Sequence, residues 1–280
     1  MKYIVMKKIR EILRKTDKLI ILAGAGFSAD SGLPVFRSNN GFWDNYPQLN
    51  GKEFTQVSSP EMLYENEDLF QGFYIHRKNL YDSTNPHIGY KKLLDFINEN
   101  NIDYFVLTTN VDEHFEKAGY SKDKIYEVHG SINHWQCGKY SCDSPIFPIN
   151  EKIEVDNNLV PEHKVYCPKC ESIARPNILM FGDFEFKSDR TDIQAKLFNQ
   201  WYYNIFRHDD LNVTVLEFGA GQSVGRLRMQ HSSILMDIPD AIGIRINTDP
   251  EEINLIRRNN MMLETKSSLE FINELCFYKP

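Results

Sequence analysis

The sequence lacks the features that would place it among membrane-spanning or nucleic-acid-binding proteins. No apolar run approaches the roughly 18–20 residues that a membrane-spanning helix requires. The first residues mix charged and apolar side chains, so they lack the uninterrupted apolar core of a signal peptide. Basic residues are fewer than acidic ones: the chain has 32 Lys and Arg and 39 Asp and Glu, which gives a net charge of −7. We therefore expect a cytoplasmic protein with no membrane partner and no direct nucleic-acid partner.

The 280 residues show no internal repeat and no low-complexity linker, which favours one large unit. Four continuous apolar runs are typical of strands that are buried on both faces of a parallel sheet. The first run begins at Leu19, and the other three cover 104–110, 213–221 and 241–248. Stretches with helical spacing, at 4–15, 88–98 and 190–207, accompany these runs. The alternation predicts an α/β fold, with a doubly wound parallel sheet and helices on both faces.

Two stretches interrupt this alternation. Residues 38–86 are predicted to be helical and rich in aromatic side chains, whereas 130–175 carry four prolines and both close cysteine pairs. We predict that these insertions form a smaller lobe. The main unit would then consist of about residues 1–37, 87–129 and 176–280.

Cysteine is also scarce, and four of the five cysteines fall into two close pairs. Cys137 and Cys142 form one pair, and Cys167 and Cys170 form the other, with the spacing of tetrahedral zinc ligands. Structural disulfides are rare in a reducing compartment, so metal is the favoured interpretation, with unrelated free thiols as the alternative. Four sulfur ligands leave no open position for water, so the predicted Zn²⁺ is structural. Cys276 stands alone and is predicted to be a packed small residue.

A glycine-rich turn, Gly24-Ala25-Gly26 followed by Ser28, comes directly after the first predicted strand. Glycines there allow the backbone to approach a pyrophosphate at a helix N-terminus. The same turn is common as a tight connection between strand and helix. The acidic ribose ligand that usually follows about twenty residues later is missing. The turn alone leaves both interpretations open.

Six ordered segments together resemble the sirtuin family over about residues 20–250. They are GAGFSADSGLPVFR (24–37), TTNVD (108–112), VHGSI (128–132), the two cysteine pairs, ARPNILMFGD (174–183) and IRIN (244–247). The resemblance implies a Rossmann-like domain that uses NAD as co-substrate, a small zinc-binding lobe, and an acyl-lysine protein segment in the cleft between them. The implied reaction is NAD-dependent protein deacylation, including deacetylation, with release of nicotinamide and O-acyl-ADP-ribose.

The resemblance also implies roles for individual residues. His129 matches the general base for a ribose hydroxyl, and an ordinary histidine pKa of about 6.5 suits that task. Asn110 would position the ribose and a water, and Asp112 would hydrogen-bond the nicotinamide amide. Outside the family, such strand-end residues are often turn formers, and a histidine is often buried against backbone. The other implied cofactor-binding residues are Gly24, Ala25, Gly26, Ser28, Phe36, Arg37, Gly219 and Asn247.

Tyr74 and Arg77 are three residues apart and are predicted to share one helix face. They resemble the Tyr-x-x-Arg pair of sirtuins that prefer succinyl- or malonyl-lysine. A guanidinium binds a carboxylate through two parallel hydrogen bonds, and a phenol adds a third. We therefore expect a desuccinylase-like preference in this acyl pocket. In the alternative, Tyr74 packs on Phe70 and Arg77 points to solvent.

The chain departs from the family pattern at several positions, including Val35, Thr109, the pair Ala220-Gly221, and Tyr90, where the family often has His. Val35 and Thr109 keep a rival activity open, namely an NAD-dependent ADP-ribosyltransferase or NAD glycohydrolase on the same scaffold. A non-catalytic sensor of NAD or peptide is a further alternative. The retained His129 favours deacylation, because transfer of the acyl group requires a base.

Overall fold

The computed structural model describes residues 2–35, 46–49, 51–208, 210–221, 225–254 and 260–277. Phe36 and Arg37, which the resemblance places at the cofactor, lie outside these residues. Among the described residues, no helix combines the length and the apolar character that crossing a bilayer requires.

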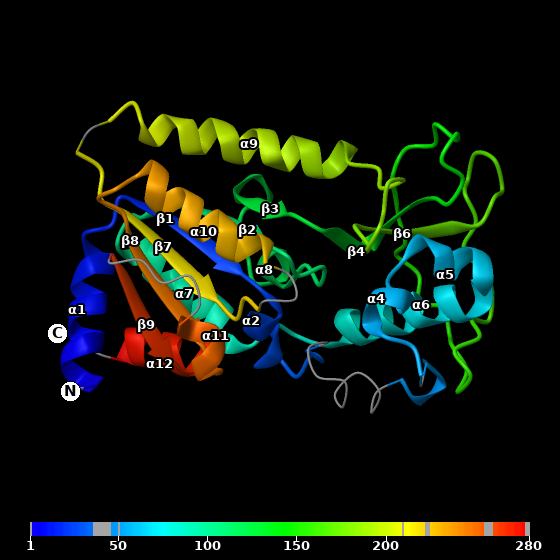
Figure 1. Cartoon of the computed structure of the whole chain (residues 1–280), viewed down its shortest axis with the longest axis horizontal. Coiled ribbons are helices and arrows are strands. Elements are labelled where there is room, and N and C mark those ends of the chain that lie inside the picture. The colour runs from blue at the N-terminus through cyan, green and yellow to red at the C-terminus, as the bar shows by residue number, and fades with distance from the viewer. Residues whose placement is uncertain are drawn as a thin grey trace.

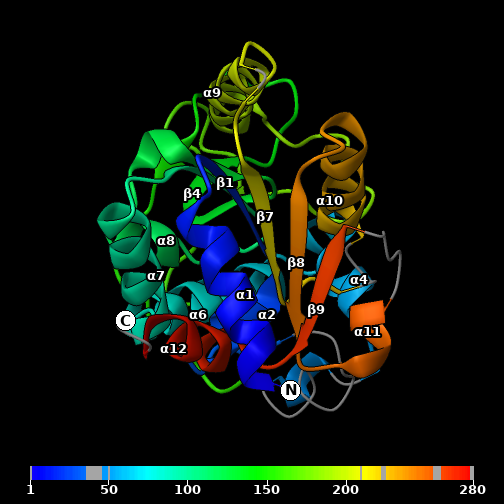
Figure 2. The same cartoon turned by 90° about the vertical axis from the view of Figure 1, so that its left-hand side faces the viewer.

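Six parallel strands form the main sheet, in the order β3-β2-β1-β7-β8-β9 (Figure 2). They are β1 (Lys18–Ala23), β2 (Asp103–Thr108), β3 (Ile125–Glu127), β7 (Val213–Phe218), β8 (Ile242–Asn247) and β9 (Met261–Thr265). The four apolar runs in the sequence coincide with β1, β2, β7 and β8, and these strands are almost entirely buried. The predicted parallel sheet is therefore confirmed.

Helices cover both faces of this sheet, as Figure 2 shows, which confirms the predicted fold class. One face packs against α1 (Lys2–Arg14), α7 (Ile88–Glu99) and α12 (Ser268–Phe277), with α2 (Ala25–Ala29) and α8 (His114–Lys117) at its end. The other face packs against α9 (Asp189–Ile205) and α10 (Arg226–Asp237). The short helix α11 (Pro250–Asn254) connects β8 to the last part of the sheet.

A second, antiparallel sheet in the order β5-β4-β6 lies at the other end of the molecule (Figure 1). Its strands are β4 (Gly130–Cys137), β5 (Phe147–Pro148) and β6 (Ala174–Ile178). It shares an apolar core with α4 (Phe54–Val57), α5 (Pro60–Glu65) and α6 (Glu67–Ser83). Two short 3₁₀ turns, η1 (Pro47–Leu49) and η2 (Lys122–Lys124), complete the described elements.

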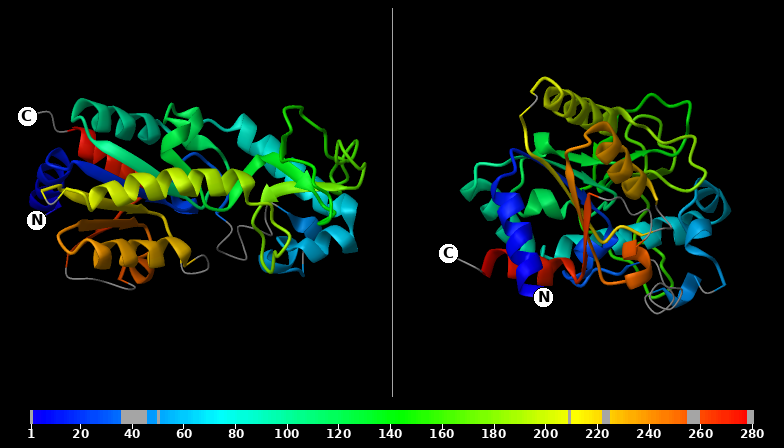
Figure 3. Two further views of the ribbon diagram at one scale, coloured as in Figure 1. Left: turned by 90° about the horizontal axis from the view of Figure 1, so that it is seen from above. Right: turned by 60° about the vertical axis from the view of Figure 1, so that its left-hand side comes forward.

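The two sheets occupy opposite ends of an elongated molecule, and α9 extends from one toward the other (left-hand view of Figure 3). We refer to α4–α6 with the β4–β6 sheet as the small lobe. Its elements come from the two stretches that interrupt the strand–helix alternation of the sequence, except that β6 continues to Ile178, three residues beyond the second stretch. The exact domain boundaries given above remain our proposal.

The strand order brings three loops together beside β1. β1 pairs with β2 on one side and with β7 on the other, so the chain reverses its direction of winding at this point. Ala23 is level with Thr108 and with Phe218 in the sheet register. The segments that follow these residues therefore meet at one edge of the sheet, where open α/β sheets bind ligands.

Candidate functional site

A pocket of about 320 Å³ opens at this edge, between the main sheet and the small lobe. Gly24, Asn110 and Ala220 line it from the loops after β1, β2 and β7. His129 lines it from the connection between β3 and β4. The opposite wall comes from the helices of the small lobe and from the segment after β6, and it includes Phe54, Ser58, Arg77, Tyr81 and Phe181.

The glycines of the turn allow two loops to touch. A Cβ on Gly24 would lie 2.7 Å from the Gly219 carbonyl oxygen, and a Cβ on Gly26 would lie 2.7 Å from the Gly219 Cα. Gly219 itself has φ of +54°, a conformation that favours glycine. The Gly26 N–H donates to the Gly219 carbonyl over 3.2 Å. Tight packing of the two loops thus explains these glycines, and Gly24 and Ala25 also line the pocket.

Ser28 is the centre of a buried hydrogen-bond network. Its hydroxyl lies 2.6 Å from Asp112 Oδ2, 2.9 Å from Asn110 Nδ2 and 2.9 Å from the Tyr90 hydroxyl. A serine hydroxyl has one proton and two acceptor positions. Because the carboxylate takes the proton and the amide nitrogen is a donor, Tyr90 must donate the third bond. Tyr90, which departs from the family pattern, therefore serves as a donor to Ser28.

Asn110 and Asp112 are fixed by further bonds to the backbone. Asn110 Nδ2 also donates to the Gly24 carbonyl over 3.0 Å, which ties the loop after β2 to the glycine turn. Asp112 Oδ1 accepts from the His114 N–H over 3.0 Å. Three of the predicted site residues, Ser28, Asn110 and Asp112, are thus in direct contact.

His129 lies in the pocket wall as an uncharged imidazole at neutral pH. Burial and, second, the positive charge of Arg226 lower the pKa of His129 to about 4, although a hydrogen bond to the backbone of Thr109 partly offsets this. The His129 carbonyl accepts from the Leu179 N–H over 3.0 Å. This hydrogen bond involves the backbone of Thr109. It therefore does not depend on the threonine side chain, which departs from the family pattern. A neutral imidazole in a pocket can accept a proton.

Asn247 and Gly219 lie at the ends of adjacent strands β8 and β7. Asn247 Nδ2 donates to the Ala220 carbonyl over 3.0 Å, and its Oδ1 accepts from the Asp249 N–H over 3.0 Å. The Gly219 N–H donates to the Ile246 carbonyl over 3.0 Å. Asn247 therefore fixes the loop after β7, in which Ala220 and Gly221 line the pocket.

Arg77 lines the pocket, whereas Tyr74 packs behind it. Tyr74 is fully buried against Phe70, and its hydroxyl lies 3.0 Å from the Ser58 hydroxyl. Arg77 is only 5% exposed, so the alternative in which it points to solvent is wrong. Its Nη2 donates to the Tyr81 hydroxyl over 2.8 Å. Burial raises the pKa of the Tyr74 and Tyr81 phenols. The positive charge of Arg77 lowers both values, but by less than burial raises them. Both phenols therefore remain protonated.

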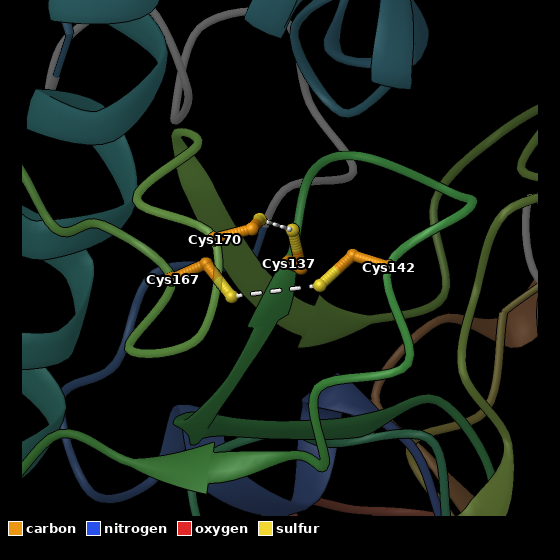
Figure 4. A group of neighbouring side chains, drawn as sticks. All are labelled: Cys137, Cys142, Cys167 and Cys170. Carbon is orange, nitrogen blue, oxygen red and sulfur yellow. Dashed lines mark hydrogen bonds between the residues drawn. The ribbon is translucent and has the colours of Figure 1, made fainter.

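The four paired cysteines converge in the small lobe (Figure 4). Their sulfur atoms all lie within 4.8 Å of one another, with 3.5 Å between Cys137 and Cys170 and 3.9 Å between Cys142 and Cys167. Sulfurs around a tetrahedral zinc, with Zn–S bonds of about 2.3 Å, lie roughly 3.8 Å apart. The cluster therefore fits a structural zinc site. Cys276 packs half-buried against the core beneath the main sheet, as predicted.

Sequence reasoning did not assign a role to three residues around the pocket. Tyr81 follows Arg77 by one helical turn, so helical spacing could have identified it. Ser58 precedes Tyr74 by 16 residues, and Arg226 follows His129 by 97 residues, so local spacing links neither pair. Only the folded chain brings Ser58 to Tyr74 and the charge of Arg226 to His129.

Comparison with known proteins gives consistent matches. The Sir2 family profile matches residues 24–198, more than half of the chain. The chain is 28% identical to an NAD-dependent protein deacylase of Candida albicans, over 64% of this chain and 69% of that protein. It is 30% identical to an NAD-dependent protein deacylase of Aquifex aeolicus, over 59% of this chain and 62% of that protein. A Daphnia pulex NAD-dependent protein deacylase is 31% identical, over 64% of this chain and 68% of its own length.

The fold also resembles that of solved Sir2 structures. A crystal structure of a Sir2 homologue in complex with NAD aligns with a TM-score of 0.71 over 97% of this chain and 92% of that chain, at 21% identity. The ordered motifs, the strand order and the family match agree. The chain therefore belongs to the Sir2 family.

Proposed function

We propose that this chain is an NAD-dependent protein-lysine deacylase. The observation that carries the proposal is the meeting of His129, Asn110 and Asp112 in one pocket between the main sheet and the small lobe. The named activities of the Candida, Aquifex and Daphnia relatives support it. The substrates that we propose are acyl-lysine side chains of proteins.

The end of the pocket at the main sheet would hold the dinucleotide. Gly24, Ala25 and Ala220 line this end with backbone, and glycine-rich backbone at such a switch point is suited to phosphates. NAD supplies the electrophilic ribose carbon that receives the acyl oxygen when nicotinamide departs. Asp112, which accepts a hydrogen bond from Ser28, would also accept one from the nicotinamide amide. Asn110 would orient the ribose, and Asn247 would shape the loop at the adenine side through Ala220.

His129 would take the proton of a ribose hydroxyl and so allow the acyl group to move to the ribose. With one water consumed, the products are free lysine, nicotinamide and O-acyl-ADP-ribose. The low pKa of His129 keeps the imidazole available as a base throughout the neutral range. The cysteine cluster would hold Zn²⁺ as a structural ion, since its four sulfurs fill a tetrahedral shell.

Exchange of Arg226 for glutamine tests the electrostatic control of this base. Without the nearby positive charge the pKa of His129 rises, so the imidazole becomes protonated and inactive at a higher pH. We expect the acid limb of the kcat/KM profile to move to higher pH in R226Q. Profiles measured from about pH 3 to 8 would detect the shift, because kcat/KM reports groups of the free enzyme. The exposed Arg207→Gln variant is the matched control, and an acid limb common to all three proteins would contradict the assignment.

We further propose that the acyl pocket prefers succinyl- or malonyl-lysine. The buried guanidinium of Arg77 lies at the small-lobe wall of the pocket, where an acidic acyl chain would find a bidentate partner. An acetyl group has no carboxylate for this arginine. The preference adds to the deacylase activity and does not replace deacetylation.

The Arg77→Met variant tests this preference. We expect the ratio of kcat/KM for succinyl-lysine to that for acetyl-lysine to fall roughly 10- to 100-fold, because a charge-assisted hydrogen bond is lost. Both peptides have the same sequence, so the acetyl rate in the same protein sample corrects for any loss of folded enzyme. Equal rates on both peptides in the parent protein, unchanged by the substitution, would contradict the preference.

The activity itself is tested with NAD and matched acetyl-, succinyl- and malonyl-lysine peptides, with products identified by mass spectrometry. Formation of O-acyl-ADP-ribose together with free lysine would support the deacylase. Cleavage of NAD without acyl transfer would instead support the ADP-ribosyltransferase or NAD glycohydrolase.

A further inference from the structure

Arg77 has a second phenol beside it that is better placed than Tyr74. Tyr81 follows Arg77 by one turn of α6, and both residues line the pocket. Tyr74 packs against Phe70 and Phe73 and bonds Ser58, which itself forms part of the pocket wall. The phenol that faces the pocket together with the guanidinium is therefore that of Tyr81.

The direction of the hydrogen bond leaves the proton of Tyr81 available. Arg77 Nη2 can only donate, so the Tyr81 oxygen is the acceptor over 2.8 Å. Within the part of the chain that the structure describes, the Tyr81 hydroxyl has no acceptor for its own proton. A hydroxyl that accepts from a cation becomes a stronger donor, because bonds in such a chain polarise one another.

The guanidinium is held in place by aromatic rings. The Arg77 Cζ lies 5.4, 5.7 and 5.3 Å from the ring centroids of Phe73, Tyr74 and Tyr81. Such contacts immobilise the arginine before any ligand binds. Tyr81 is 5% exposed, so an acceptor that reached it would be shielded from competing water.

We propose that Tyr81 is a specificity-determining residue that donates its phenolic proton to the terminal carboxylate of an acidic acyl-lysine, beside the guanidinium of Arg77. Tyr74 then acts as a wall residue that supports Ser58. This inference rests on the proposed deacylase function. It assigns the phenol that contacts the acyl chain to Tyr81, one turn of α6 beyond Arg77, in place of Tyr74.

The test compares Tyr81→Phe with Tyr74→Phe, since each substitution removes a single hydroxyl. Two quantities are measured for succinyl- and acetyl-lysine peptides of one sequence: the ratio of their kcat/KM values with NAD, and the ratio of their dissociation constants by calorimetry without NAD. We expect Tyr81→Phe to lower succinyl selectivity in both measurements, roughly tenfold or more for one charge-assisted hydrogen bond. The fall in Tyr74→Phe is expected to be clearly smaller.

The outcomes separate this inference from the proposed activity. If no peptide is deacylated but succinyl selectivity in binding depends on Tyr81, the deacylase proposal fails and the assignment of Tyr81 stands. If peptides are deacylated but Tyr81→Phe keeps the selectivity of the parent protein, the assignment is overturned. A larger loss in Tyr74→Phe than in Tyr81→Phe would overturn it as well, as would a parent protein without succinyl selectivity.

Discussion

Exchange of His129 for alanine is expected to lower NAD-dependent deacylation by a factor of about 10² to 10⁴, the range in which a positioned general base contributes. The imidazole lines the pocket, and its lowered pKa keeps it neutral at pH 7. No other imidazole among the described residues lines this pocket, so none is placed to substitute for it. The measurement is the rate of O-acyl-ADP-ribose formation by mass spectrometry at saturating NAD.

The matched control for this prediction is His163→Ala, which removes an exposed histidine from the small lobe. Binding of NAD to H129A, measured by calorimetry, shows whether the pocket survives the substitution. A variant that binds NAD and still deacylates at the rate of the parent protein would contradict the role of His129 as base.

Loss of the cysteine cluster is expected to have the largest effect on stability. In Cys170→Ser one thiolate ligand becomes a hydroxyl, which is a poor ligand for zinc, and removal of metal by a chelator should act in the same way. Cys137 is the last residue of β4, whereas Cys167 and Cys170 lie shortly before β6. The metal would therefore link the two strands that pair in the small lobe. We expect the bound metal to be lost. The free energy of unfolding should then fall by several kcal/mol, as expected when a structural metal site is removed.

Metal content by plasma mass spectrometry and near-ultraviolet circular dichroism test this expectation. The buried Trp135 lies in β4, two residues before Cys137, so its dichroism reports on packing of the small lobe. Cys276→Ser is the control, because that thiol packs beneath the main sheet. If C170S contained no less metal than the parent protein and unfolded at the same temperature, the cluster would not be a zinc site.

The sequence predicted the main sheet well, because strands buried on both faces are continuously apolar. The short edge strands β3 and β9 were not predicted, since the three residues of β3 carry no such pattern. The first helix was predicted, and its buried face centres on Met6, Ile9 and Leu13, whereas Ile4 is 70% exposed. The position of a terminal helix on the sheet depends on distant partners such as Phe271 and Leu275 in α12, which local periodicity does not contain.

The candidate site was predictable to the extent that its residues belong to contiguous motifs. Ser28, Asn110 and Asp112 follow predicted strands, and parallel strands deliver such residues to one edge. The hydrogen-bond partner Tyr90 comes from a helix more than sixty residues after Ser28 in the chain. Arg226 acts on His129 through space, so no local pattern could reveal it.

The central position of β1 has a consequence for how the chain folds as it is synthesised. β1 pairs on one side with β7, and Val213 follows Ala23 by 190 residues. At ribosomal rates of about 5–20 residues per second, β7 emerges roughly 10–40 s after β1. During this interval the apolar Leu19–Leu22 segment has an unsatisfied edge that favours pairing with other chains. Aggregation during expression is therefore expected to begin at β1, and a chaperone that covers this first strand should raise the yield of folded protein.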